Sequence, residues 1–493
     1  VIDGSKEIRA AARGHKLRIK EGAGEVYHTT LLGKLQCLAV NKAASFDPGG
    51  VGIEMEADKP NWYDALNGLP GLLGSSLSET LELKRFCLFL LEVLESLPAD
   101  ENISLFTELA TFLRDLQAVL VQEKDPAAFW HKANDAKEHY RLHIRQGIEG
   151  REEEIPLVDV KEFLRLVVEK ARHGVERAKD ENGLLSTYFY HEVVDHAVLD
   201  KKHGDYSYVL PVSFKRHPLP LFLEGFVHAM RTRRDHKHAQ ELYQKLRRSP
   251  LFDKKLKMYK VNSDLSSQSE EIGRARIFPR GWLENESIWL HMEYKYLLEI
   301  LRNGLYEEFY ATFKEVLIPF LSPDCYGRSI LENSSFIVSS AHEDKALHGQ
   351  GFVARLSGST AEFLHVWLLM NAGLRPFHWD AQKGLTLTLK PALAAWLFTK
   401  EETTTDFVDK EQEKRKITLP KNTYAFNFLG GTLVVYHNPK RRNTFDPGAQ
   451  IGEMTLTYPA PDHPVKIAGA VIPPPYADDI RENKVDRIDV RFE

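Results

Sequence analysis

Cysteine is scarce in this sequence, and that scarcity excludes a disulfide framework. Cys37, Cys87 and Cys325 are the only cysteines among 493 residues, and they lie far apart. Disulfide-stabilised domains need several cysteine pairs, and a cysteine zinc site needs closely spaced ligands. The sequence therefore fits a reducing compartment, and we expect a cytoplasmic location.

The sequence also lacks a long apolar run and an excess of either charge. Its apolar runs, such as 86–91, are far shorter than the roughly 20 residues that cross a bilayer. Charged residues make up 27% of the chain, and their formal net charge is only −5. Because nucleic acids and anionic membranes attract basic stripes, we expect neither as a partner.

Several catalytic and cofactor motifs are missing as well. His191-Glu192 is not followed by the second histidine of a zinc-protease helix. The sequence has no P-loop, no dinucleotide fingerprint and no Gly-x-Ser-x-Gly nucleophile elbow. We therefore expect no metal and no organic cofactor.

Apolar residues recur at helical spacing through most of the chain. Leucines and phenylalanines in 78–97 follow this period until Pro98 ends it. The other predicted helices, with few strands between them, are 103–122, 126–148, 158–179, 221–230, 236–246, 287–302, 305–321 and 359–371. This pattern predicts a mainly α protein, built as a helical toroid or bundle rather than as a βαβ sheet.

The last part of the chain has a different period. Residues 384–389 alternate between apolar and polar, as a half-buried strand does. Further predicted strands are 424–428, 432–436, 465–472 and 485–492. The charged, threonine-rich stretch 400–416 is predicted to be a surface loop. Residues 384–493 should therefore form a small β unit beside a large α unit.

One carboxylate lies between two aromatic residues and a glycine-rich turn. Trp62 and Tyr63 precede Asp64, and the turn follows over 67–76. Aromatic rings can stack against a sugar, and an apolar setting favours the protonated carboxyl that a general acid needs. The alternative is that Asp64 only caps a helix in a loop.

A second polar cluster precedes the predicted helix 287–302. Glu284, Asn285 and Glu286 come first, and Ser287 and His291 are expected to share one face of the helix. These side chains could hydrogen-bond sugar hydroxyls at the rim of a cleft. The alternative is a capping box followed by a core histidine.

Two further clusters are rich in small residues. His342 and His348 precede Ser359 and Thr360, where a helix is predicted to begin. Backbone N–H groups and the helix dipole favour an anion such as phosphate at a helix start, although serine and threonine also occur there simply as caps. The last cluster, 430–432, is a glycine pair before a strand, and a plain β-turn or bulge explains it equally well.

These four clusters, in this order, resemble motifs of the inverting disaccharide and oligosaccharide phosphorylases, which include cellobiose, chitobiose and β-1,3-glucan phosphorylases. The family's catalytic segment reads Asp-Trp-Asn-Asp-Gly-Met-Asn, and 61–67 share its Trp, second Asp and final Asn. Residues 284–291 resemble its Glu-Asn-Gly-Gly followed by a helix with a histidine. Here Glu286 and Ser287 replace the two glycines.

The resemblance continues towards the end of the chain. Residues 353–363 resemble the family's Asn-Ser-Trp-Leu-Thr-Gly-Thr-Ala-Ala-Trp, and 384–391 resemble its Gly-Leu-x-Leu-x-Pro strand. Residues 428–433 resemble its Phe-Arg-Gly-Ala-Thr-Tyr, with Leu429 at the arginine position. The likeness runs from residue 49 to the end, apart from 99–269.

The resemblance implies an (α/α)6 barrel over residues 1–383, with a long helical insertion near 99–269, and a C-terminal β unit over 384–493. The family carries a β-sandwich, the first part of the barrel and phosphate-binding arginines before its catalytic Asp. Only 63 residues precede Asp64 here. We therefore expect a barrel without its N-terminal part, completed by an upstream domain or a partner subunit, with a homodimer as one form.

The implied activity is reversible phosphorolysis of β-1,3- or β-1,4-gluco-oligosaccharides with inversion, giving α-glucose 1-phosphate. Asp64 is the implied catalytic acid, and inorganic phosphate is the co-substrate. The implied substrate-binding residues are Trp62, Tyr63, Asn67, Asn285, Glu286 and His291. The implied phosphate-binding residues are His342, His348, Ser359, Thr360, Gly431 and Thr432.

Two alternatives stay open. An inverting glycoside hydrolase on the same fold would need a second carboxylate as base, for which Glu284 and Glu286 are candidates. A non-catalytic, glucan-binding half of a larger assembly would need neither a catalytic acid nor a base.

Overall fold

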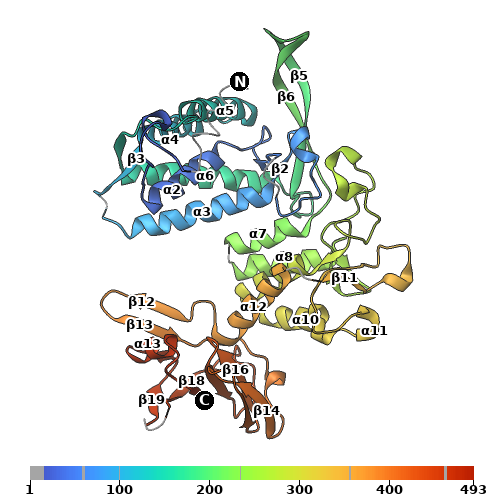
Figure 1. Cartoon of the computed structure of the whole chain (residues 1–493). Coiled ribbons are helices and arrows are strands. Elements are labelled where there is room, and N and C mark those ends of the chain that lie inside the picture. The colour runs from blue at the N-terminus through green and yellow to red at the C-terminus, as the bar shows by residue number, and fades with distance from the viewer. Residues whose placement is uncertain (1–15, 58–60, 99, 234, 355–356, 460–462) are drawn as a thin grey trace. The chain divides into compact units, whose positions relative to one another are not determined.

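The computed structural model describes residues 16–57, 61–98, 100–233, 235–354, 357–459 and 463–493. The chain forms two compact units and passes between them several times (Figure 1). The first unit draws on Val1–Arg234, Glu241–Met292 and Phe336–Phe352, and the second on Asp235–Gln240, Glu293–Ser335 and Val353–Glu493.

A group of helices forms the larger part of the first unit. They are α2 (Leu31–Ala43), α3 (Leu77–Glu95), α4 (Thr107–Gln122), α5 (Pro126–His143) and α6 (Leu157–Arg177). The Thr30 side chain caps α2 by accepting from the Gly33 N–H. Asp125 caps α5 in the same way, with Pro126 at the first helical position, where a missing N–H has no consequence.

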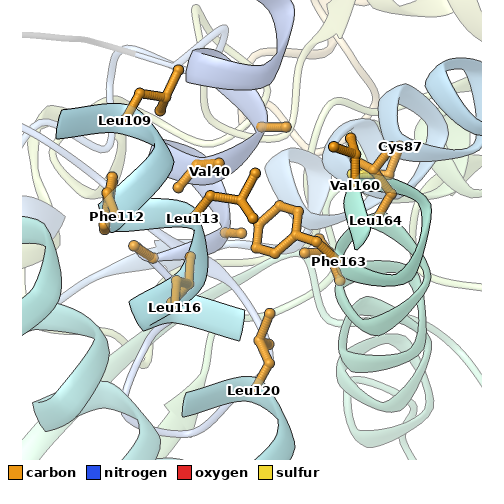
Figure 2. Close-up of a cluster of buried hydrophobic side chains, with 14 of the residues drawn as sticks. Val40, Cys87, Leu109, Phe112, Leu113, Leu116, Leu120, Val160, Phe163 and Leu164 are labelled. Atoms are coloured by element: carbon orange, nitrogen blue, oxygen red, sulfur yellow. The ribbon is translucent and has the colours of Figure 1, made fainter. Parts of the chain in front are cut away.

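The core of this helix group is aliphatic and aromatic. Phe163 of α6 points toward Leu113 of α4, whereas Leu164 of α6 lies beside Cys87 of α3, and each of these side chains is at most 1% exposed (Figure 2). Two short antiparallel strands, β3 (Asn102–Phe106) and β4 (Glu152–Pro156), lead into α4 and α6. Burial of these side chains removes apolar area from water and holds the group together.

A four-stranded sheet also belongs to the first unit. Its order is β1-β2-β5-β6, with β1 (Ile53–Glu54), β2 (Ser75–Ser76), β5 (Tyr188–His203) and β6 (Tyr206–Pro218). The segment near 99–269 was predicted to be a helical insertion, and that prediction is wrong for β3, β4, β5 and β6. Valines and tyrosines on both sides of Gly204 carry a hairpin signal, but their spacing does not alternate cleanly.

The remaining elements of the first unit surround the loops described below. They include α7 (Leu223–Arg233), β7 (Phe252–Asp253), β8 (Met258–Tyr259), β9 (Ile288–Trp289), the 3-10 helices η2 (Leu69–Leu72), η3 (Glu270–Ile272) and η4 (Arg274–Arg276), and most of α8 (His236–Arg248). Strand β9 pairs with Phe336 and Ile337 of β10 (Ser334–Ile337). The helix α9 (Leu290–Arg302) begins directly after β9.

The second unit combines helices with a β sheet. Its main sheet has the order β16-β17-β21-β18-β19, formed by β16 (Thr423–Phe428), β17 (Thr432–His437), β18 (Ile451–Thr457), β19 (Val465–Ala468) and β21 (Arg487–Phe492). A smaller sheet joins β12 (Phe377–Asp380), β13 (Gly384–Thr388) and β20 (Val471–Ile472). Its helices are most of α9, α10 (Tyr306–Val316), α11 (Pro323–Tyr326), α12 (Ser357–Ala372) and α13 (Tyr476–Arg481).

The predicted surface loop 400–416 is instead a hairpin of β14 (Thr403–Val408) and β15 (Lys414–Leu419). Threonines and a short charged turn suit an exposed hairpin, whose outer side chains need no apolar period. Its inner residues Phe407 and Ile417 pack against Leu419 and Val435.

The protein is therefore a helix-rich fold with strands in both units, at 39% helix and 25% strand. Within the described part of the chain the helices do not close into a barrel. None of the described helices combines the length and apolar character that a membrane span requires. The two units also divide the chain differently from the predicted boundary at residue 384.

Candidate functional site

Two carboxyl groups, distant in sequence, meet in the first unit. The side chains of Asp64 and Glu284 are hydrogen-bonded to each other. Burial and then the charge of Asp64 raise the pKa of Glu284 to about 7. The Asp64 side chain is 52% exposed and that of Glu284 only 15%, so Asp64 is the member that a ligand can reach.

An arginine accompanies the pair. Nη2 of Arg274 lies 2.9 Å from Oδ2 of Asp64 and 3.9 Å from Oε1 of Glu284. One guanidinium facing two carboxyl groups neutralises a single negative charge. The arrangement therefore favours a pair that keeps one proton at neutral pH.

The loop that carries Asp64 is fastened to the loop that carries Arg274. Oδ1 of Asn67 accepts from the Arg274 N–H at 3.1 Å, and the Ala275 N–H donates to the Ala65 carbonyl at 3.0 Å. Gly273 makes this approach possible, because its φ is +124° and a Cβ there would lie 2.5 Å from Oδ1 of Asn67. Asn67, predicted as a sugar ligand, thus positions Arg274.

Asp64 does not cap a helix. The helix that follows it, η2, begins at Leu69 and is preceded by Gly68. The alternative interpretation of the Asp64 motif as a helix start therefore has no structural counterpart.

The turn that carries Glu284 is held by three donors. The Tyr63 hydroxyl donates to the Glu284 carbonyl, and Nε1 of Trp289 donates to the Leu283 carbonyl at 2.8 Å. The Ser287 hydroxyl also donates to the Leu283 carbonyl. Because helix α9 begins at Leu290, Ser287 lies before the helix, and the predicted helix face shared with His291 does not form.

Tyr63 is buried and supports the neighbouring loop, so its ring does not offer a surface on which a sugar could stack. Its ring is 1% exposed and packs edge-on against Phe222, with centroids 5.0 Å apart. Burial, then the charges of Glu284, Glu224 and Asp64, raise the pKa of Tyr63 well above its usual value. The hydroxyl therefore stays protonated and remains a donor to the Glu284 turn.

Trp62 is the aromatic residue beside Asp64 that stays half-buried. Its Nε1 donates to Nδ1 of His291 at 3.1 Å, which leaves the proton of a neutral imidazole on Nε2. Its ring lies 6.2 Å from that of Trp289 and 5.7 Å from that of His291, both edge-on. Trp62, Trp289 and His291 thus form one aromatic group next to the carboxyl pair.

The buried carboxylate of Glu286 is paired with two basic side chains. It is 1% exposed, Oε1 accepts from Lys260 at 2.6 Å, and Oε2 accepts from Arg280. Its φ of +55° is a left-handed value that favours glycine, and the resembled motif has glycine at this position. Its neighbour Asn285 is also buried and donates to the Phe278 carbonyl at 2.7 Å.

The two histidines predicted to bind phosphate lie together in the first unit. Nε2 of His348 is 2.8 Å from the His342 carbonyl, and Nδ1 accepts from Lys255 at 2.7 Å. The His342 ring is 6.1 Å from that of Trp282, which leads through Phe336 to Trp289. The His342 ring is therefore connected to this aromatic group only through the rings of Trp282 and Phe336.

The other predicted phosphate ligands belong to the second unit. Thr360 is exposed on α12, and Ser359 beside it is buried. Thr432 is fully buried, and its hydroxyl donates to the Val485 carbonyl at 2.9 Å. Gly431 lies in the turn before β17. Arg355, which adjoins this cluster in sequence, lies outside the described residues.

Arg274 and the pairing of Glu284 with Asp64 were not predicted from the sequence. Glu284 was considered as a residue at the rim of a sugar-binding cleft and as a base for hydrolysis. The sequence has three arginines between 274 and 280, just before Glu284, and these could have indicated a cation beside the carboxyl groups. The structure assigns Arg276 to the carbonyls of Gln268 and Ser266 and Arg280 to Glu286, which leaves Arg274 for the carboxyl pair.

Comparison with protein-family models gave no matching family, and comparison with curated proteins gave no match.

Proposed function

We propose that this protein is a glycoside phosphorylase acting in the cytoplasm. It would cleave β-1,3- or β-1,4-gluco-oligosaccharides with inorganic phosphate and invert the anomeric carbon, giving α-glucose 1-phosphate. The observation that carries the proposal is the hydrogen-bonded pair Asp64 and Glu284, beside Arg274 and the aromatic group of Trp62. The proposal includes an (α/α)6 barrel completed by a partner subunit.

Asp64 is proposed to deliver the proton. As the exposed member of the pair, it protonates the glycosidic oxygen while the bond from that oxygen to the anomeric carbon breaks. A phosphate oxygen forms the new bond to the anomeric carbon from the opposite face. Glu284, the less exposed member, keeps the proton on the pair at neutral pH, since its pKa is raised to about 7.

The geometry of the candidate bases favours phosphorolysis over hydrolysis. An inverting hydrolase separates its carboxyl groups by about 6.5–9.5 Å to admit a water molecule, and a retaining one by about 5–5.5 Å. Hydrogen-bonded carboxyl groups are closer, at about 2.5–3.0 Å between oxygens. Glu286, the other candidate base, is buried between Lys260 and Arg280. Phosphate needs no base, because it is already charged.

The phosphate is proposed to bind through His342 and His348 of the first unit. Ser359, Thr360, Gly431 and Thr432 belong to the second unit, and their role in binding phosphate stays a prediction. Lys255, which donates to His348, adds a cation that the sequence did not suggest. In the sugar site, Trp62 offers a stacking surface and His291 an Nε2–H donor. Asn285, Glu286, Tyr63 and Asn67 act there by holding the loops.

Phosphate dependence tests the proposal. Purified protein incubated with laminari- or cello-oligosaccharides should release α-glucose 1-phosphate only when phosphate is present. Asp64→Asn should reduce the rate roughly a hundredfold to ten-thousandfold, because general acid assistance is lost. Glu153→Gln, which breaks an exposed ion pair of 2.9 Å to Arg114, is the control and should retain activity. Release of free glucose at equal rate without phosphate would reject phosphorolysis.

A further inference from the structure

The outer part of the β5–β6 hairpin carries an unusual number of exposed apolar side chains. We call residues 192–217 the arm. Its large hydrophobic residues that are at least 39% exposed are Val193, Val194, Val198, Leu199, Tyr206, Tyr208, Val209, Leu210 and Val212. Contiguous apolar surface of this kind on a protein marks an interaction site.

The arm has no support from the rest of the described chain beyond its base. Strand β5 pairs with β2 only at Tyr188 and Phe189, and Phe214 of β6 packs on Trp130 with rings 5.3 Å apart. Every residue from Glu192 to Leu210 that the strands contain is exposed, and Figure 1 shows the two strands leaving the unit as a ribbon. An isolated two-stranded hairpin is marginally stable in water, so this ribbon gains from a partner.

Both faces of the arm are apolar. Ala197 pairs with Leu210, and the adjacent residues Val198 and Val209 pair with each other. Because successive side chains of a strand point to opposite faces, the two pairs lie on different faces. Packing against the protein's own body would cover one face and leave the other exposed.

The charges of the arm cancel. The acidic residues are Glu192, Asp195, Asp200 and Asp205, and the basic ones are Lys201, Lys202, Lys215 and Arg216. The tip charges of Asp200, Lys201, Lys202 and Asp205 have no ion-pair partner within the described chain. A membrane or nucleic acid would require a basic excess. A second arm of the same sequence supplies both signs and is self-complementary.

One edge of the arm is open to strand pairing and the other is blocked. Pro211 in β6 has no N–H to donate, which interrupts any new ladder along that edge. Beyond Tyr190, β5 pairs only with β6 in the described chain, so its other edge has unused N–H and C=O groups. The edge of β5 is therefore the side on which another strand can add.

We propose that the arm binds the arm of a second copy of this chain, edge to edge along β5, in a two-fold symmetric dimer. The 192–217 segment falls within the roughly 20–30 residues that each partner contributes to a standard interface. Apolar side chains of the two β5 strands pack side by side across the new ladder, and the unpaired tip charges find partners of opposite sign. This inference does not depend on the proposed enzymatic activity.

The test is the mass of the full chain in solution, measured by light scattering during size exclusion. The wild type should have twice the chain mass of 56.4 kDa. Val198→Asp combined with Leu210→Asp changes one side chain on each face and should give the single-chain mass. Both side chains are exposed, at 65% and 44%, so the fold should be unchanged by circular dichroism.

The control is Val158→Asp, which changes a valine of α6 that is 58% exposed outside the arm, and it should leave the dimer intact. Hydrogen exchange provides a second measurement, since β5 amides beyond Tyr190 should be protected in the wild type and lose protection in the arm variant. A monomeric wild type would overturn the proposal. So would a dimer that persists in the arm variant with unchanged exchange.

Discussion

At the scale of single residues, Glu284 cannot be understood apart from Asp64. Burial and the neighbouring Asp64 carboxylate raise the pKa of Glu284 to about 7. The positive charge of Arg274 offsets part of the negative charge of the two carboxyl groups. This coupling gives Glu284 an effect on pH dependence that a purely structural residue would lack.

For the proposed reaction, kcat/KM of the wild type should fall as pH rises through about 7, where Glu284 loses its proton. Glu284→Gln removes the group that titrates near 7, so the falling limb of the pH–rate profile should move away from this pH. Glu153→Gln is the control and should keep the wild-type profile. A Glu284→Gln variant that is slower but has an unmoved limb would mean that Glu284 only holds the loop.

The same group should affect stability, which needs no substrate to measure. The pKa of Glu284 is raised from 4.5 to about 7 in the folded protein, so its contribution to stability is complete below 4.5 and lost as pH rises through 7. Urea unfolding at a series of pH values should therefore show the wild type losing stability over this window. Glu284→Gln should lose less over the same window, and equal losses would contradict the assigned shift.

At the scale of elements, the site depends on how closely two loops approach. The loop 62–68 and the loop 271–275 share backbone hydrogen bonds in both directions, from Gly68 N–H to the Ile272 carbonyl and from Ala275 N–H to the Ala65 carbonyl. Neither loop contains an α-helix or a strand. Their relative position is therefore set by these bonds and by glycines at the contact.

Gly273→Ala should destabilise the protein by roughly 1–3 kcal/mol, because φ is +124° and the new Cβ would lie 2.6 Å from the Ala65 carbonyl oxygen. Gly71→Ala is the matched control, since no atom lies within 4 Å of a Cβ there, and it should change stability by less than about 0.5 kcal/mol. Urea unfolding of the three proteins gives the comparison. If the Gly273→Ala variant is as stable as the wild type, the two loops can move apart at that position without a loss of folding free energy.

At the scale of the whole molecule, the two units are interleaved along the chain. Helix α10 and helix α12 both pack on the β-rich part of the second unit. The Tyr310 hydroxyl donates to the Ala392 carbonyl at 2.5 Å, and the Tyr436 hydroxyl donates to the Asn371 carbonyl at 2.7 Å. Trp367 of α12 contacts Phe426 of β16 with rings 5.5 Å apart. The β-rich tail therefore shares its core with earlier helices.

A fragment of residues 384–493 should consequently fail to fold cooperatively, because Phe426 and Tyr436 would lose Trp367 and Asn371. Its near-ultraviolet circular dichroism should be weak, and its urea transition should be broad, whereas the full chain should show a cooperative transition. A sharp transition with strong near-ultraviolet signal would establish 384–493 as an autonomous domain and support the boundary predicted at residue 384.

The sequence by itself determined the local elements. The helices α3, α4, α6 and α12 and the strands β13, β16 and β17 lie within a few residues of their predicted ranges. Each contains its own apolar period or its own turn residues, and these signals act over less than twenty residues. The motif around Asp64 was also visible, because its aromatic and glycine neighbours are consecutive.

Only the tertiary structure decided what these elements meet. Asp64 finds Glu284 and Arg274 more than two hundred residues away, through loops that carry no period. Strands β5 and β6 were missed because both of their faces are apolar and exposed, so no alternation distinguishes an inner face. Long-range pairing depends on which surfaces remain free after local folding. A single sequence indicates which surfaces are apolar or polar, but it does not indicate which two surfaces come together.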